Sequence, residues 1–197
     1  MERAQPETVD PRVLRTRRDV VDAATTIFLE GGWSAVTHAE VARRSGYAKG
    51  TIYAHWPTQL DLIRASAGQM CGAAVHAAPT GDLRADLIRD LADFAEDLSH
   101  RHLDRVLGGV LERAGTDPGA AEIREQLWDE GTGAMRALLS THLRRKEVEP
   151  ALALLTGGVL VRVAFEGRPA SKVFIGDLVD RVLASTGHDD IGTPHDS

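Results

Sequence analysis

Apolar residues recur along most of the chain at spacings of three and four positions, which is the period of an amphipathic α-helix. The first such segment begins at Asp10-Pro11, where an acidic cap precedes a proline at the first helical position, and it ends at Gly31-Gly32. Its apolar positions are Val20, Ala24, Ile27 and Phe28. No stretch alternates apolar and polar residues as a half-buried strand would, so the pattern predicts an all-α fold of about nine helices.

Two short segments follow, and both carry signals for helix boundaries. Thr37 and Glu40 form a capping box, which begins a helix that must end near Ser45-Gly46. A second short helix is expected from about Ala48 to His55, because Pro57 disfavours the α-conformation at the residue before it. These residues therefore predict two short helices joined by a tight turn.

The remaining two thirds of the chain repeat the helical period, with expected breaks at 78–81, 115–119 and 167–169. Pro150 is expected to begin a helix. A kink or break is expected at Gly131 and Gly133, since each glycine costs about 1 kcal/mol inside a helix.

Composition adds little until the charge is divided along the chain. The 197 residues include 23 Lys and Arg and 29 Asp and Glu, a net charge of -6, which argues weakly against a nucleic-acid partner. Residues 1–57, however, hold 8 basic and 7 acidic side chains, whereas the rest holds 15 and 22. The N-terminal part is slightly basic and the C-terminal part is acidic, which indicates a division of labour between them.

Several classes of protein are excluded by what the sequence lacks. No apolar run approaches the roughly 18 to 20 residues that span a bilayer, and the first residues lack the apolar core of a signal peptide. We therefore expect a cytoplasmic protein with no membrane partner. The single cysteine, Cys71, excludes an internal disulfide and a thiolate zinc site, and it is either a redox-sensing thiol or inert packing.

Three histidines leave a rival class open. A helical enzyme or metal-binding protein could use His100, His102 and His142. The spacing of His100 and His102 does not place them on one helical face, and no glycine-rich phosphate loop or nucleophile motif is present. We therefore expect no enzyme activity, no metal and no cofactor.

The most specific signal lies in residues 37–56. Two short helices joined at Ser45-Gly46-Tyr47 form the arrangement of a helix-turn-helix, whose second helix enters the major groove of DNA. Gly46 supplies the positive φ of the turn, and Val41, Ala42 and Ile52 are expected to face the packed side. The alternative is a helical hairpin within a purely structural bundle, which a DNA-binding assay would distinguish.

A set of short motifs surrounds this segment at ungapped spacing: Ile27-Phe28, Gly31-Gly32-Trp33, Val36-Thr37, Val41-Ala42, Gly46-Tyr47, Lys49-Gly50-Thr51-Ile52-Tyr53 and His55-Trp56-Pro57. With these motifs, the stretch from about Arg12 to Ala74 resembles the DNA-binding region of the tetracycline-repressor (TetR/AcrR) family of bacterial transcription regulators. Residues 158–183 are similar to the last two helices of one group of these regulators. The sequence departs from the family at Ala48, Trp56 and Gln59, where a small hydroxyl cap, a phenylalanine and a phosphate-binding lysine are common.

The resemblance implies a homodimeric repressor that binds double-stranded, near-palindromic operator DNA and is released by a small-molecule effector. It implies a flexible arm (1–11), a DNA-binding domain (12–77), an effector-binding and dimerisation domain (78–187) and a disordered tail (188–197). DNA contacts are expected from Thr37, His38, Arg44, Ala48, Lys49, Gly50, Thr51, Tyr53 and His55. Arg15, Arg17 and Arg18 form either a basic arm beside the groove or a charged solvent face.

The resemblance also implies a ligand cavity and a dimer interface in the C-terminal part. The bulky apolar residues best placed by order to line the cavity are Met70, Phe94, Leu103, Leu107, Trp128 and Met135, and ordinary core packing is the alternative for each. The residues expected at the dimer interface are Leu152, Leu155, Val159, Val163, Leu178 and Val182. Gly157-Gly158 permits either a close helix approach or a kink.

Overall fold

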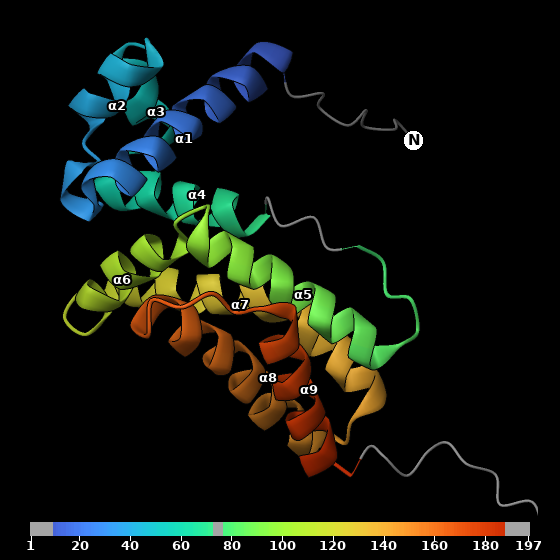
Figure 1. The fold of residues 1–197 in the computed structure, drawn as a ribbon. Coiled ribbons are helices and arrows are strands. Elements are labelled where there is room, and N and C mark those ends of the chain that lie inside the picture. The colour runs from blue at the N-terminus through green and yellow to red at the C-terminus, as the bar shows by residue number, and fades with distance from the viewer. Residues whose placement is uncertain (1–9, 73–76, 188–197) are drawn as a thin grey trace, which may run out of the picture. The chain divides into compact units, whose positions relative to one another are not determined.

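The computed structural model describes residues 10–72 and 77–187, and of residues 71 and 72 it describes only the backbone. These residues contain nine α-helices and no strand, which confirms the all-α prediction (Figure 1). The expected arm and tail fall largely outside the described residues, as does the side chain of Cys71. The helices are α1 (Pro11–Gly31), α2 (His38–Ser45), α3 (Lys49–His55), α4 (Gln59–Gly72), α5 (Leu83–Ser99), α6 (Leu103–Ala114), α7 (Pro118–His142), α8 (Arg145–Leu160) and α9 (Lys172–Ser185), with a 3-10 turn η1 (Trp33–Ala35) and a π-helical turn η2 (Val161–Phe165).

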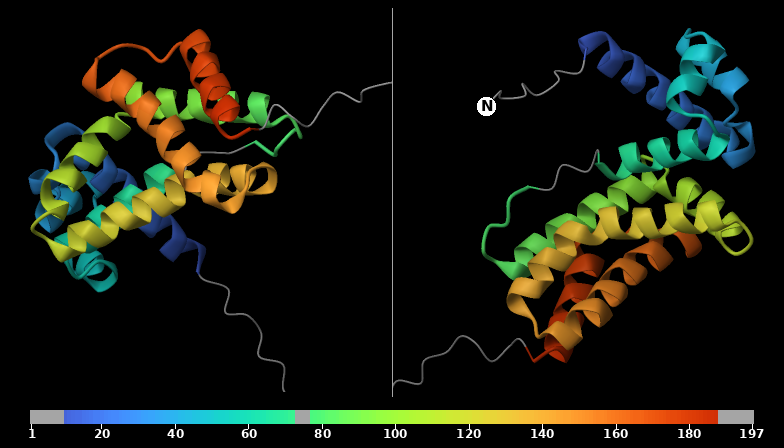
Figure 2. Two further views of the ribbon diagram at one scale, coloured as in Figure 1. Left: turned by 90° about the horizontal axis from the view of Figure 1, so that it is seen from below. Right: turned by 180° about the vertical axis from the view of Figure 1, so that it is seen from behind.

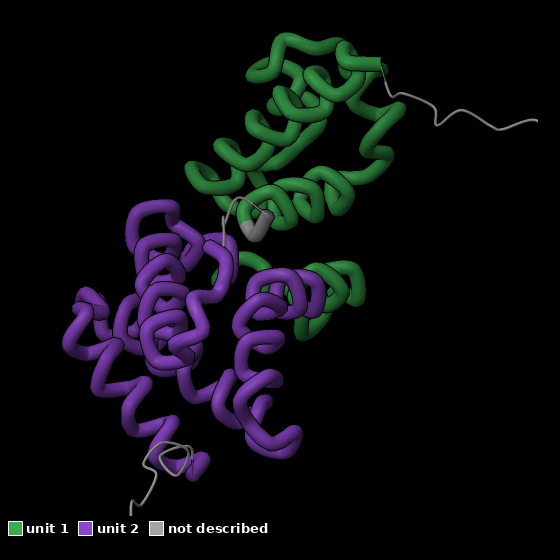
Figure 3. The backbone as a smooth tube through the Cα atoms, turned by 90° about the vertical axis from the view of Figure 1, so that its right-hand side faces the viewer, with its two compact units in different colours: residues 1–70, 108–124 green, residues 71–107, 125–197 purple. Residues whose placement is uncertain are grey.

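The chain forms two compact units, shown in separate colours in Figure 3. The N-terminal unit contains residues 1–70 and 108–124, and the C-terminal unit contains residues 71–107 and 125–197. Residues 108–124 were expected in the effector part, but they pack within the N-terminal unit. The guanidinium of Arg113 lies over the ring of Trp33, 5.3 Å from its centroid, and Nη2 of Arg113 donates to the hydroxyl of Ser34 at 2.9 Å.

The boundaries of the first helices follow from their sequence signals. The side chain of Asp10 accepts a hydrogen bond from the backbone N–H of Arg12, and Pro11 opens α1. The helix turns its apolar stripe inward, where Val20, Ala24, Ile27 and Phe28 are all buried. The Phe28 ring meets Trp33 edge to face, with ring centroids 6.2 Å apart, so η1 is fixed to the end of α1.

The C-terminal unit is built around a second core, to which α5, α8 and α9 contribute side by side (Figure 2). Fully buried side chains of all three helices gather there. They include Leu87 and Leu91 of α5, Leu152 and Leu155 of α8, and Ile175 in the first turn of α9. On the rim of this core, Arg84 of α5 pairs with Asp180 of α9, with Nε and Oδ1 2.6 Å apart. One continuous core therefore holds these three helices together.

Two expectations about the helices are wrong, a break at Gly131 and Gly133 and a helix start at Pro150. Gly131 and Gly133 lie inside α7, which is one unbroken α-helix of 25 residues, so packing along this helix outweighs the propensity cost of the two glycines. Pro150 does not begin α8, because that helix starts at Arg145, where a carboxylate oxygen of Glu147 accepts the backbone N–H of Arg144 at 3.3 Å. Pro150 instead lies within the helix.

Gly158 provides a close helix approach within the subunit. A Cβ atom added to Gly158 would lie only 2.7 Å from Cδ2 of Leu178, so the missing side chain is what lets α8 and α9 come together. Gly157 has nothing within 4 Å of an added Cβ. The sequence left two interpretations of this glycine pair open, a close helix approach or a kink. The contact between Gly158 and Leu178 is a close helix approach, and it joins two helices of the same chain.

The segment Arg145–Phe165 corrects the expectation that no apolar run is long enough to span a membrane. An 18-residue window in it has a mean hydropathy of 1.6, and 28% of that window is buried in the structure. By length and composition alone this helix could cross a bilayer. One of its sides packs into the C-terminal core through Val148, Leu152, Leu155 and Val159.

Candidate nucleic-acid interface

The segment from α2 to α3 forms the turn that the sequence predicts. The hydroxyl of Thr37 accepts the backbone N–H of Glu40 at 3.2 Å, which begins α2. Gly46 ends α2 in the left-handed conformation, with φ 76°, and its N–H donates to the carbonyl of Ala42 at 3.0 Å. The chain then enters α3 at Ala48, which makes no side-chain cap, as its lack of a hydroxyl predicts.

Helix α3 has one buried side and one exposed side. Ile52 is fully buried and Trp56 is 8% exposed, so these two residues fix the helix to the rest of the N-terminal unit. The exposed residues on this helix and at its N-cap are Ala48, Lys49, Gly50, Thr51, Tyr53 and Ala54. A short helix that is anchored at only two apolar positions thus presents the remaining residues, one of them a lysine, to solvent.

Gly50 has no structural reason to be a glycine within this subunit. A Cβ atom added there would meet nothing within 4 Å, and φ of Gly50 does not lie in the left-handed region. An alanine would favour the helix by about 1 kcal/mol. Neither φ nor a neighbour among the described residues therefore accounts for the absence of a side chain at Gly50.

The structure corrects the expected role of His38. This side chain is only 8% exposed, and its Nε2 lies 2.6 Å from the backbone carbonyl oxygen of Trp56. Because a carbonyl can only accept, Nε2 carries the proton and donates. The His38 ring also stacks on Tyr53, with centroids 3.9 Å apart and planes 5° apart. A ring held in this way has Nε2 and one face committed to contacts within the protein, and it fixes α2 to the C-terminal half of α3.

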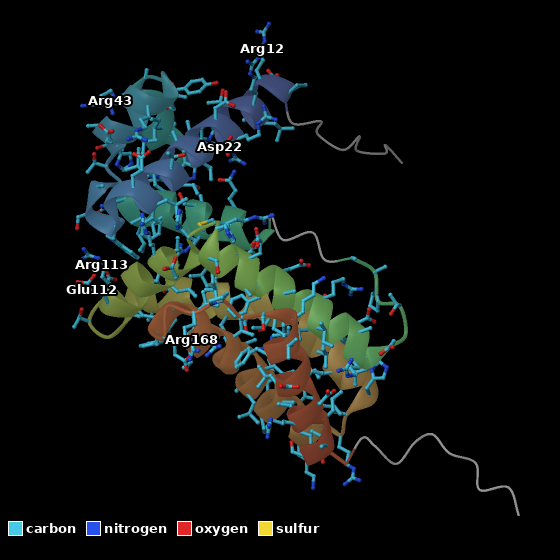
Figure 4. The ribbon with its side chains drawn as sticks, viewed as in Figure 1. Arg12, Asp22, Arg43, Glu112, Arg113 and Arg168 are labelled. Carbon is cyan, nitrogen blue, oxygen red and sulfur yellow. The ribbon has the colours of Figure 1, made fainter. Side chains whose placement is uncertain are left out.

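Arg44 is also committed to contacts within the protein. Its Nη2 donates to a carboxylate oxygen of Glu30 at the end of α1, and its Nε lies 3.5 Å from Glu40. The hydrogen bond from Arg44 lowers the pKa of Glu30 below its ordinary value. Arg43, labelled on α2 in Figure 4, donates to Glu40 and is the more exposed of the two arginines. Arg44 therefore connects α1 to α2.

The start of α4 explains the family residue that is missing at Gln59. Its amide Nε2 donates to the carbonyl oxygen of Trp33 at 3.1 Å, so this half-buried side chain serves the fold. Thr58 caps the start of this helix, since its hydroxyl donates to Asp61 at 2.7 Å and accepts the backbone N–H of Asp61 at 3.2 Å. The hydrogen bonds from Thr58 hold the pKa of Asp61 below its ordinary value.

His55 lies at the C-terminal end of α3 and is half-buried. It lines an open recess together with Arg17 and Arg18 of α1. Arg15 does not line this recess, and its Nε lies 3.8 Å from Asp19. The structure therefore separates Arg15 from the two arginines that the sequence groups with it.

The candidate ligand-binding residues do not all share one environment. Met135 is 7% exposed within the C-terminal core, and Phe94, Leu103 and Leu107 are partly buried against that core. Trp128 is 41% exposed. Met70 belongs to the N-terminal unit, whereas the other five belong to the C-terminal unit. Four of the six thus gather at one core, and their role in ligand binding stays a prediction.

The residues expected at the dimer interface need correction. Leu152, Leu155 and Val159 are fully buried inside the subunit, and Val182 is 4% exposed, so none of them offers a surface to a partner. Val163 and Leu178 are partly buried against the same core. The apolar residues that these helices do expose are different ones: Leu154, Val161, Phe165 and Val173, with exposed fractions of 57%, 48%, 81% and 75%.

The histidines of the rival class lie in ordinary surroundings. Nδ1 of His100 is 3.1 Å from Glu96 one turn earlier, and Nδ1 of His142 is 3.0 Å from the carbonyl oxygen of Leu138. His102 precedes α6 with φ 57°. Within residues 10–72 and 77–187, no three His, Cys, Asp or Glu side chains are grouped as a metal site requires.

An all-α N-terminal unit that exposes the second helix of a helix-turn-helix defines a DNA-binding regulator. Residues 20–65 match the model of the tetR family of bacterial regulatory proteins, and residues 77–182 match the tetracyclin repressor-like C-terminal domain. The second match alone covers more than half of the chain, which therefore belongs to the tetracycline-repressor family of transcription regulators. Members of this family are regulators, and the enzyme alternative has no support.

Relatives and solved structures agree with this assignment. An uncharacterized HTH-type transcriptional regulator of Bacillus subtilis, YdeS, is 24% identical over 179 residues, which cover 86% of this chain and 88% of YdeS. The A-factor receptor protein of Streptomyces griseus is 25% identical over 187 residues, or 90% of this chain and 66% of the receptor. The crystal structure of the multidrug binding protein EbrR complexed with ethidium superposes with a TM-score of 0.66 at 23% identity, covering 85% of this chain and 98% of EbrR.

Proposed function

We propose that the protein is a dimeric repressor that binds a near-palindromic operator in the bacterial cytoplasm and leaves it when a small molecule binds the C-terminal unit. The observation that carries the DNA-binding part is the exposed side of α3, with Lys49 at its start and Gly50 beside it. Lys49 is placed to reach a base edge or a phosphate, and Thr51 and Tyr53 offer hydroxyl donors to the backbone. The hydroxyl of Thr37 and the N–H of Ala48 add donors at the two helix starts.

The test begins by selecting duplexes from a randomised pool with the full-length chain. Mobility shift with the selected duplex then compares the wild-type chain with Lys49→Ala and Gly50→Ala. Lys49→Ala removes a charged contact and should weaken binding by about 1–3 kcal/mol if Lys49 reads a base. Gly50→Ala should stabilise α3 by about 1 kcal/mol and still weaken DNA binding, because its methyl group occupies the space that the duplex needs.

Arg145→Ala provides the matched control, since this exposed residue carries the same charge as Lys49 and lies on α8, in the other unit. Its duplex affinity should equal that of the wild-type chain. Undiminished binding by both α3 variants would refute the assignment of α3 as the recognition helix. A wild-type chain that selects no duplex would contradict the proposed function as a whole.

The exposed side of α8 supports the dimer. Leu154, Val161 and Phe165 follow one another at spacings of seven and four, so they form a stripe on one side of the helix and its π-helical end. Val173, at the start of α9, is a further large apolar side chain exposed in this part of the chain. A contiguous apolar surface on a soluble protein marks an interaction site, and a second copy of this chain would cover it in a two-fold assembly.

The dimer is tested by sedimentation of Phe165→Ser at micromolar concentration. We expect the wild-type chain to sediment as a dimer and Phe165→Ser to shift towards the monomer with its helix content unchanged. The matched control is Leu111→Ser, because Leu111 is also an exposed apolar residue, at 57%, and lies on α6. A wild-type monomer, or a Phe165→Ser dimer of unchanged affinity, would contradict the proposal.

The effector part rests on the apolar core of the C-terminal unit and on the names of the relatives. The A-factor receptor is named for its ligand, and EbrR has been crystallised with ethidium and with proflavin. A ligand that favours the conformation unable to span successive major grooves would lower operator affinity about 5- to 150-fold, for a coupling of about 1–3 kcal/mol. A thermal-shift screen identifies stabilising molecules, and mobility shift then asks whether they release the duplex. A molecule that stabilises the chain and leaves duplex affinity unchanged would contradict release.

A further inference from the structure

Asp104, in the first turn of α6, has a carboxylate oxygen, Oδ1, that is shielded from solvent and has no hydrogen-bond partner among the described residues. Two other buried side-chain atoms in the described part of the chain share this property, Nε of Arg113 and Nε of Arg162. Both arginines still donate through another nitrogen, Arg113 to Ser34 at 2.9 Å and Arg162 to Glu166 at 2.7 Å. Within the described residues, Asp104 is therefore the only acid with a buried oxygen left unpaired.

The position of Asp104 in its helix does not account for this oxygen. A buried carboxylate oxygen without a partner is unfavourable, because it has lost its hydrogen bonds to water and gained none from the protein. The helix dipole favours an acid in the first turn, but an exposed carboxylate receives the same benefit. The dipole thus explains an acid at position 104 and leaves the shielding of Oδ1 unexplained. A donor supplied by a ligand would satisfy this oxygen.

Two basic side chains that precede Asp104 in the chain are bound to acids of α5. Nδ1 of His100 lies 3.1 Å from Glu96, and Nη1 of Arg101 lies 3.1 Å from Asp97. None of the ion pairs in the described part of the chain includes Asp104. The protein therefore provides cations close to Asp104 in sequence and uses them elsewhere.

The neighbours of Asp104 on α6 are apolar. Leu103 and Leu107 lie one turn apart and pack against the C-terminal core, as does Phe94 of α5. Asp104 directly follows Leu103 and precedes Leu107 by three positions, so its side chain leaves the helix beside theirs. Residues 58–197 also hold 22 acidic and 15 basic side chains, and this excess of negative charge attracts cations to the C-terminal part.

We infer that the effector is an organic cation with apolar substituents and that Asp104 recognises its charge. A protonated amine donates a short, charge-assisted hydrogen bond to a carboxylate, while its apolar part packs on Leu103 and Leu107. A metal ion needs more oxygen ligands than one carboxylate supplies, and the described residues hold no group of three acids, cysteines or histidines for it. The inference rests on the proposed function, because it names the chemical class of the molecule that the C-terminal unit is proposed to bind.

The test uses the full-length chain and three molecules that share a naphthalene ring and differ in charge: cationic naphthylmethylammonium, neutral naphthylmethanol and anionic naphthoate. Calorimetric titration at one pH and one ionic strength measures the affinity of each for the wild-type chain, Asp104→Asn and Asp177→Asn. Asp177→Asn is the matched control, because it removes the same charge from an exposed position on α9.

We expect the wild-type chain and Asp177→Asn to bind the ammonium at least about tenfold more tightly than the alcohol, and the carboxylate least tightly. Asp104→Asn should bind the ammonium about 10- to 100-fold more weakly than the wild-type chain does, because the carboxamide keeps the shape and loses the charge. Its affinity for the alcohol should stay at the wild-type value. The inference is overturned if the wild-type chain binds the ammonium no better than the alcohol, or if Asp104→Asn keeps the wild-type affinity for the ammonium.

Urea unfolding without ligand separates this role from a structural one. Asp104→Asn should be at least as stable as the wild-type chain, since it removes the charge from an oxygen that no described residue bonds. A less stable Asp104→Asn, together with a wild-type chain that does not prefer the ammonium, would show that Asp104 serves only the fold.

A duplex assay keeps this inference apart from the proposed function. The ammonium should lower the affinity of the wild-type chain and of Asp177→Asn for the selected duplex, and at the same concentration it should leave that of Asp104→Asn unchanged. Binding of the ammonium without release would contradict its class as the effector class. A wild-type chain that selects no duplex would refute the proposed function, while the titrations would still decide whether Asp104 recognises a cation. Release of the wild-type chain and of Asp104→Asn by equal concentrations of the alcohol, with no preference for the ammonium, would refute the inference and leave the proposed function standing.

Discussion

His38 provides the sharpest test of how the recognition helix is held. The structure shows its ring between α2 and α3, where Nε2 donates to the carbonyl of Trp56 and one face of the ring stacks on Tyr53. The resemblance to the family predicts a phosphate contact for the same residue. When the ring is removed in His38→Ala, the two roles predict different changes in stability and in the salt dependence of DNA binding.

The size of the effect follows from the two contacts. A hydrogen bond of this kind contributes about 0.5–1.5 kcal/mol to stability, and an aromatic pair contributes about 0.5–1.5 kcal/mol. His38→Ala should therefore lower the free energy of unfolding by about 1–3 kcal/mol. His38→Phe retains a ring that can stack on Tyr53 and loses only the hydrogen bond, so its loss should be about half as large.

The assay combines urea unfolding, followed by circular dichroism, with duplex affinity measured at several salt concentrations. If His38 positions α3, His38→Ala lowers stability and affinity together, and the salt slope stays at its wild-type value. His38→Phe should recover part of both.

A phosphate contact would give a different pattern. Stability would then hardly change, while the salt slope would fall by about 0.9, and His38→Phe would be as defective in DNA binding as His38→Ala. That combination would refute the positioning role, because the loss of a ring that only positions α3 would lower stability and leave the salt slope unchanged.

Two further predictions concern stability. Burial raises the pKa of Asp86, but hydrogen bonds from Thr80 and Arg89 more than offset this and leave it below its ordinary value. Its stabilising contribution is thus complete above about pH 4 and is lost as the pH falls through the lowered pKa. Asp86→Asn should therefore flatten the loss of stability below about pH 4 in an acid titration followed by circular dichroism, and an unchanged titration would contradict this. Gly46→Ala should cost about 1–2 kcal/mol in urea unfolding, because φ is 76° and no neighbour lies within 4 Å of an added Cβ, and Gly46→Asn should cost less; equal losses would show that φ is not the cause.

The local signals in the sequence were sufficient for the helix-turn-helix. Thr37 and Gly46 mark the two ends of α2 by chemistry that acts within four residues, so neighbouring positions alone decide it. The exposed residues of α3 were predicted for the same reason, since a seven-residue helix has few positions and Ile52 takes the buried side. What the sequence could not show is that His38 turns inward, because a histidine at a helix start suits both a buried and an exposed position.

Contacts between distant segments account for the rest. The packing of Arg113 on Trp33 joins residues 80 positions apart, and no periodicity in either segment signals it. The recess depends on three helices in the same way, since Arg17 and His55 meet only once α1, α3 and α4 have packed. A charge count along the sequence groups Arg15, Arg17 and Arg18, whereas in the structure Arg17 and Arg18 line the recess and Arg15 does not.

Helix α8 shows why the apolar positions that the resemblance assigned to a dimer interface are core positions of the subunit. Its buried stripe of Val148, Leu152, Leu155 and Val159 and its exposed stripe of Leu154, Val161 and Phe165 both follow helical spacings. When a helix is apolar on two sides, its sequence does not show which side packs into the core of the subunit. The same composition makes Arg145–Phe165 apolar enough to cross a bilayer. The packing of α5 and α9 removes the ambiguity, because their leucines and isoleucine cover the first stripe. The second stripe stays exposed on the subunit, so a substitution at Phe165 tests the proposed dimer, whereas one at Leu155 tests the fold.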